Sequence, residues 1–154
     1  MLEALQAMSS VILDPFLLLL IFATTIIGVI IGVLPGIGAT TGAALLLPFT
    51  LTMTPVHAIT VLATIYVSAT FAGSITAILI NTPGTSAAAA TTFDGFPLAQ
   101  RGEAGRALGV AVVSSTVGGI FSVIVLCIAA PMLARVAYHF RPPEYFALTL
   151  FGLS

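Results

Sequence analysis

Residues 15–93 contain no aspartate, glutamate, lysine or arginine, and this apolar run is interrupted twice by a Pro-Gly pair, at Pro35-Gly36 and at Pro83-Gly84. As a single helix rising about 1.5 Å per residue, the run would extend roughly 120 Å, several times the ~30 Å hydrocarbon core of a bilayer. The chain must therefore fold back on itself, and the Pro-Gly pairs indicate where it does so. The sequence predicts an integral membrane protein whose helices are interrupted at defined points.

The composition excludes a soluble domain. Hydrophobic residues make up 59% of the chain and charged residues 6%, and the mean hydropathy is +1.22. A soluble domain usually carries about 25% charged residues, so this chain could not cover its surface in water and calls for a lipid bilayer. All four basic side chains are arginines outside the apolar run, which leaves no basic face for nucleic acid. Cys127 is the single cysteine, which excludes a disulfide framework and a thiolate metal site.

Proline, glycine and charge divide the chain into helical segments. Three segments are long enough to span the membrane, namely 15–33, 56–80 and 107–134. Two shorter helical pieces follow the breaks at 34–38 and 81–84, and they cover 39–51 and 85–92. The sequence therefore predicts an all-α membrane protein, a single transmembrane domain over 1–154 with about three full transmembrane helices and two broken or re-entrant Pro-Gly helical hairpins.

Residues 94–106 carry four charged side chains and are predicted to form a polar loop, because ionised groups at the bilayer centre are costly. Beyond the last spanning helix, residues 144–154 begin another apolar helix, so the chain is expected to be truncated. Arginines are equally numerous on the two sides of 107–134, so the sequence does not specify the membrane orientation.

The two breaks carry the polar chemistry. Broken helix at membrane depth survives only where it is buried in protein or lines a wet cavity, because lipid cannot satisfy the freed backbone groups. Each break opens into a new helix start with unpaired N–H groups and nearby hydroxyls, those of Thr40 and Thr41 and those of Thr85 and Ser86. A helix start carries roughly half a positive charge and several free donors, so these starts predict an anion site that needs no basic side chain.

The end of the helix before the second break is rich in neutral oxygens. Asn81 and Thr82 offer amide, hydroxyl and carbonyl oxygens that suit sodium, and Ser74 and Thr76 lie nearest to them on the same helix. Discontinuous helices with donor-rich starts and oxygen-rich ends match the general plan of a secondary transporter. Two other interpretations stay open: both Pro-Gly pairs are ordinary extramembrane turns, or His57 acts as a proton relay instead of lying at the interface.

Several motifs, in order along the chain, together resemble the large membrane subunit of the bacterial tripartite tricarboxylate transporters (TctA-like). They are GVLPGIG at 32–38, LLLPF at 45–49, GSITAILINTPGT at 73–85, DGFPLA at 94–99, GEAGRAL at 102–108 and PEYFA at 143–147. The resemblance covers nearly the whole chain from about Gly28. Ser86 stands where many relatives have proline.

The resemblance implies a multi-pass transporter subunit of the bacterial inner membrane that takes up tricarboxylates or related organic acids, driven by an ion gradient. It implies two partners, a small membrane subunit and a periplasmic solute-binding protein. It also implies a related second half with its own Pro-Gly motif, so that this chain is the truncated half of an inverted-repeat transporter. The expected substrate-binding residues are Pro35, Gly36, Gly38, Thr40, Thr41, Asn81, Thr82, Pro83, Gly84, Thr85 and Ser86.

Other functions remain as alternatives: a structural or assembly membrane subunit, or a channel, without a substrate site of its own. An enzyme is not expected, because the apolar region offers no nucleophile with an oriented base and no metal ligand set. No cofactor is expected. Sodium is the expected coupling ion, held by Asn81, Thr82, Ser74 and Thr76, because the apolar run lacks a titratable group other than His57 that would suit a proton.

Overall fold

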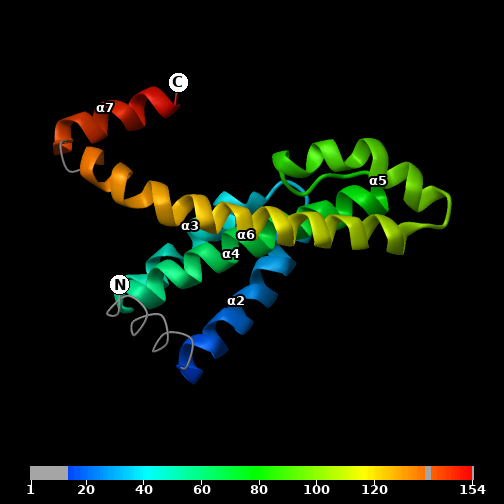
Figure 1. Ribbon diagram of the computed structural model, residues 1–154, viewed down its shortest axis with the longest axis horizontal. Helices are drawn as coiled ribbons and strands as arrows, with labels where there is room; N and C mark the ends of the chain where they lie inside the picture. Colours follow the sequence, from blue (N-terminus) through cyan, green and yellow to red (C-terminus); the bar gives the residue numbers. More distant parts are fainter. Residues whose placement is uncertain (1–13, 138–139, 154) are drawn as a thin grey trace. The chain divides into compact units, whose positions relative to one another are not determined.

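The computed structural model describes residues 14–137 and 140–153, and within these residues it contains helices and no strands. The helices are α2 (Pro15–Val33), α3 (Gly38–Thr50), α4 (Pro55–Ile80), the 3-10 helix η1 (Ser86–Ala90), α5 (Thr91–Gln100), α6 (Ala104–Ala137) and α7 (Pro142–Leu153) (Figure 1). The chain divides into two compact units, one up to residue 111 and one from residue 112, and each is described by itself.

Three of the described helices are long and apolar enough to cross a membrane: Pro15–Val33, Pro55–Ile80 and Ala104–Arg135. Two of them begin alike, with a polar cap followed by proline at the first helical position, where its missing N–H costs nothing. Asp14 caps α2, and Thr54 caps α4. The prediction of an all-α membrane protein is confirmed.

Helices α2 and α4 run parallel. Asp14, before α2, contacts His57 near the start of α4, and further along the pair Gly28 lies against Ser68 and Gly32 against Ala69. A Cβ added at Gly32 would lie 2.2 Å from the Ala69 carbonyl oxygen, so only glycine permits this approach. The close pairing of small residues therefore fixes α2 against α4.

Helix α3 connects α2 to α4 and returns the chain toward the level at which α2 began. It leads from the end of α2 to the start of α4, so it runs opposite to both. Its Gly42 lies beside Ile31 of α2 and Ile65 of α4, and Ile65 is fully buried. The three helices thus bury one apolar seam, with Leu17 and Val61 nearer its other end.

Beyond the second break the chain runs along the last part of α4. Gly84 lies against Gly73, and Gly95 of α5 lies against Ile78. As the chain proceeds from Gly84 to Gly95, its contacts on α4 shift from Gly73 to Ile78, toward the end of that helix. Helices η1 and α5 therefore run parallel to α4 and beside it (Figure 1). Residues 81–85 therefore carry the chain back along α4 before the next helix begins.

The region predicted as a polar loop, 94–106, is mostly helical. Helix α5 continues to Gln100 and α6 begins at Ala104, which leaves 101–103 outside the helices. Asp94 stands exposed in the first turn of α5, where a negative charge suits the helix dipole, so solvent access did not require a loop. Arg106 pairs with Glu103 at 2.9 Å, one helical turn away.

The predicted short helix over 85–92 also differs from the structure. Its first part is the 3-10 turn η1, which leads directly into α5. In the second unit, α7 starts at Pro142, and the Glu144 carboxylate accepts the Arg141 N–H at 2.7 Å at that start.

Candidate functional site at the two helix breaks

The first break depends on two glycines with left-handed backbone. Gly36 has φ +92° and Gly38 has φ +65°. A Cβ at either position would meet nothing within 4 Å, so the backbone angle, and not crowding, demands glycine here. Pro35 and Gly36 are exposed.

The start of α3 has no side-chain cap. Ile37 occupies the cap position and its side chain accepts no hydrogen bond, so the first N–H groups of α3 have no acceptor from that residue. Thr40 and Thr41 lie in this first turn and are exposed. The start therefore presents backbone donors and two hydroxyls to whatever lies beside the first break.

The second break begins where Asn81 ends α4. Asn81 has φ +57°, a left-handed conformation that asparagine tolerates better than most residues, and its N–H donates to the Thr76 carbonyl. The Thr82 N–H also reaches the Thr76 carbonyl, at 3.4 Å, and the Thr82 hydroxyl donates to the Ile80 carbonyl at 3.2 Å. Asn81 thus has a structural role as a helix terminator, with its side chain exposed.

Three glycines bring the second break against the end of α2. The Gly84 N–H donates to the Gly73 carbonyl at 3.3 Å. A Cβ on Gly84 would lie 2.2 Å from the Gly32 carbonyl oxygen and 2.9 Å from the Gly73 Cα. Gly32 lies in the last turn of α2, two residues before the first break, so the structure brings the chain around both breaks into one neighbourhood. We call Gly32, Gly73 and Gly84 the glycine contact.

Thr85 stands beside the glycine contact and has an unusual hydroxyl. Its backbone is extended and it precedes η1 without a side-chain capping bond. Among the described residues, its Oγ1 is the buried side-chain oxygen or nitrogen that lacks a hydrogen-bond partner. Such an atom costs free energy unless something binds it. Thr85 is therefore the strongest candidate ligand at the second break.

The helices that follow the two breaks run in opposite directions. Helix α3 runs back along α2 from the first break, whereas η1 and α5 run forward along α4 from Gly84. Each amino end presents N–H groups at its own break. The positive end of each helix dipole favours an anion beside it.

The predicted sodium ligands are more dispersed. The Thr76 hydroxyl is buried and donates to the Gly73 carbonyl at 3.1 Å, and Ser74 is half-buried. Asn81 lies about 10 Å farther along the axis of α4 than Ser74, at about 1.5 Å per residue. Direct binding of one ion by both side chains is not expected.

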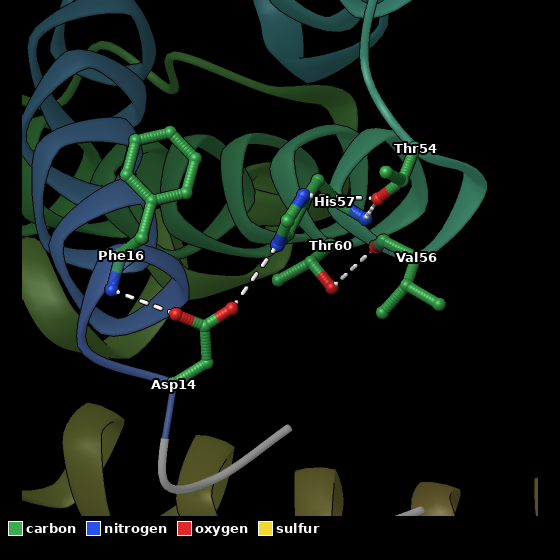
Figure 2. A network of polar contacts seen from close by, with 6 residues as sticks. All are labelled: Asp14, Phe16, Thr54, Val56, His57 and Thr60. Carbon is green, nitrogen blue, oxygen red and sulfur yellow. Dashed lines mark hydrogen bonds and ion pairs between the residues drawn. The ribbon is translucent and has the colours of Figure 1, made fainter. Parts of the chain in front are cut away.

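One polar cluster that the sequence did not predict joins the starts of α2 and α4 (Figure 2). His57 Nε2 lies 3.4 Å from Asp14 Oδ2, and His57 Nδ1 lies 2.9 Å from Thr54 Oγ1. The edge of one ring faces the other in the Phe16–His57 pair, with centroids 5.6 Å apart and an interplanar angle of 79°. Asp14 precedes its partner by 43 positions, so sequence spacing alone gave no sign of the pair.

Asp14 serves two helix starts at once. Its Oδ1 accepts the Phe16 N–H at 2.9 Å, which caps α2, while its Oδ2 faces His57. Partial burial raises the pKa of the Asp14 carboxyl, but the hydrogen bonds from Phe16 and His57 outweigh this effect, so the pKa lies below its ordinary value.

Comparison with known proteins decides the family. The model of the tripartite tricarboxylate transporter TctA family matches residues 18–154. The chain belongs to the TctA family. It is 47% identical over 141 residues to an Agrobacterium vitis protein described as an uncharacterized 52.8 kDa protein in the TAR-I ttuC' 3'region. That match covers 92% of this chain and 28% of the relative, so the chain spans about a quarter of the relative's length. No solved structure matches.

Membership in the TctA family confirms the resemblance found in the sequence. Two of the six motifs that carried it border the glycine contact: one runs from Gly32 to Gly38, and the other from Gly73 to Thr85. The structure places six of the residues predicted for the site in three positions. Gly84 and Thr85 lie at the glycine contact, whereas Thr40, Thr41 and Ser86 are exposed at the adjoining helix starts, and Asn81 ends α4.

Proposed function

We propose that this TctA-family chain forms part of the substrate path of an ion-coupled secondary transporter for tricarboxylates or related organic acids. The carrying observation is the glycine contact, which places the second break against the end of α2 beside the first break. The opposed helix starts supply backbone donors for carboxylate oxygens without any lysine or arginine. The substrate-binding residues are then those of the two breaks, with Thr85 Oγ1 as a direct ligand.

Sodium as the coupling ion follows from the chemistry of the same region. Neutral oxygens lie along the last part of α4: Asn81 and Thr82 interrupt the helix, and Ser74 and Thr76 precede them by up to about 10 Å along its axis. Such oxygens hold a hard monovalent cation without a carboxylate. A proton would need a titratable group, and His57 lies at the other end of α4. We therefore propose sodium symport, with Asn81 and Thr82 as the central ligands.

The complete system would work in the bacterial inner membrane with a small membrane subunit and a periplasmic solute-binding protein, as the family's architecture implies. A structural or assembly subunit without its own site is the second candidate. A chain with that role would not need the unpartnered Thr85 hydroxyl, which favours the transport function.

The test is uptake of radiolabelled carboxylate by proteoliposomes that contain the complete transporter and its binding protein. We expect uptake to follow a sodium gradient, and Thr85→Val to lower it at least tenfold while Thr85→Ser, the matched control, retains most of it. Uptake that follows a proton gradient without sodium, and is lost on His57→Ala, would overturn the coupling proposal. Wild-type uptake by the Thr85→Val variant would overturn the site.

A further inference from the structure

The cluster at the starts of α2 and α4 is remote from the candidate site. His57 lies about 24 Å along the α4 axis from Gly73, the residue of α4 in the glycine contact. Residues 15–93 contain no carboxylate and no arginine or lysine. Of the helices packed together in this unit, α2 faces His57 with Asp14 from its cap, and α3 has no titratable side chain to offer.

The hydrogen-bond pattern sets the roles of both ring nitrogens. The Asp14 carboxylate can only accept, so His57 Nε2 must carry the proton in that contact. In the neutral ring Nδ1 is then the acceptor, and the Thr54 hydroxyl donates to it while accepting the His57 backbone N–H at 3.4 Å. Each polar atom of the cluster has a partner when His57 is neutral.

The same geometry accommodates a second proton on the ring. With Nδ1 protonated, the Thr54 hydroxyl turns and accepts from it, and no heavy atom has to move. The contact with Asp14 then becomes an ion pair. The positive end of the α4 dipole destabilises a charge on His57, whereas the Asp14 carboxylate 3.4 Å away stabilises it. The contact with Asp14 therefore determines whether the charged ring is stabilised.

We propose that Asp14, His57 and Thr54 form a proton-binding clasp between the parallel helices α2 and α4, which tightens when His57 takes up a second ring proton. A histidine ring can carry one or two protons, and the hydrogen bonds of the clasp accommodate either state. The clasp holds the ends of α2 and α4 opposite the glycine contact, so its state sets how firmly the two helices stay together. This inference does not depend on the transported substrate or on the coupling ion.

A double-mutant cycle tests the clasp. The variants are Asp14→Asn, which keeps a good helix cap but removes the charge, His57→Gln, which keeps an N–H donor but cannot be protonated, and the double variant. Unfolding of the chain in mixed micelles would be measured at pH 5.5 and pH 8.0. The cycle cancels other groups that titrate over this range.

We expect the coupling between the two positions to change the unfolding equilibrium constant about two- to fivefold more at pH 5.5 than at pH 8.0. A merely structural hydrogen bond would give coupling that does not depend on pH. Coupling equal at the two pH values, or absent at both, would overturn the proposal. Because both substitutions conserve shape and hydrogen bonding, the variants are expected to fold.

Discussion

At the scale of single residues, glycine has two separate roles in this chain. At Gly36 and Gly38 the left-handed backbone demands it, while at Gly32 and Gly84 the closeness of neighbouring backbone does. Sequence spacing could indicate the second role on α2, because small residues four apart predict close helix contact. It could not show that Gly84, from a distant motif, would lie against Gly32.

Gly32→Ala is predicted to destabilise the packing of α2 against α4. The new Cβ would meet Ala69 backbone atoms at 2.2 to 2.7 Å, and overpacking of this kind costs about 1 to 3 kcal/mol. Gly109→Ala is the matched control, because that helical glycine has nothing within 4 Å, and alanine there improves helix propensity. The free energy of unfolding in mixed micelles measures both. Equal effects of the two substitutions would contradict the close contact.

The lowered pKa of Asp14 predicts that the folded chain loses stability under acid conditions. Because its pKa is lowered in the folded chain, its contribution is present at higher pH and is lost as the pH falls through that lowered value, below about pH 4. Thermal unfolding in lipid nanodiscs between pH 3 and 6 should show this loss in the wild type. Asp14→Asn should flatten this part of the profile, and an unchanged profile would mean that the carboxylate does not contribute.

At the scale of helices, proline and glycine predicted where α2 and α4 end, because these residues act through local backbone geometry. The helix over 91–100 was missed because its charged and proline residues read as a loop, although Asp94 suits a first helical turn. The parallel pairing of α2 with α4 and the Asp14–His57 contact arise from tertiary packing, which local patterns do not encode. Of the candidate site, the sequence supplied the residues and the structure supplied the glycine contact.

Substitutions of Asn81 can separate its role in the turn that ends α4 from its proposed role as a sodium ligand. Asn81→Gly keeps the left-handed conformation that ends α4 but removes the amide oxygen, so it should leave the fold intact. In the complete transporter we expect it to raise the sodium concentration for half-maximal uptake about tenfold, the effect of losing roughly 1.4 kcal/mol of binding. Asn81→Ala, which strains the turn, serves as the comparison. Unaltered sodium dependence in Asn81→Gly would leave Asn81 as a helix terminator alone.

At the scale of the whole molecule, this chain corresponds to about a quarter of its Agrobacterium vitis relative's length. A transporter site between repeats draws on both halves, so the chain alone is predicted not to catalyse uptake. Vesicles that contain only residues 1–154 should therefore show no carboxylate accumulation above empty vesicles. Accumulation driven by this chain alone would contradict a site shared with other parts of the transporter.

The central claim is that the two breaks face one bound carboxylate, and substrate protection tests it most directly. Single cysteines would replace Thr40 or Ser86, both exposed at the helix starts, in a complete transporter whose native Cys127 is changed to serine. Thr52→Cys, exposed in the turn after α3, is the control. With sodium present, a tricarboxylate should slow maleimide labelling at positions 40 and 86 but not at position 52. Labelling that stays unchanged at either break would contradict the account.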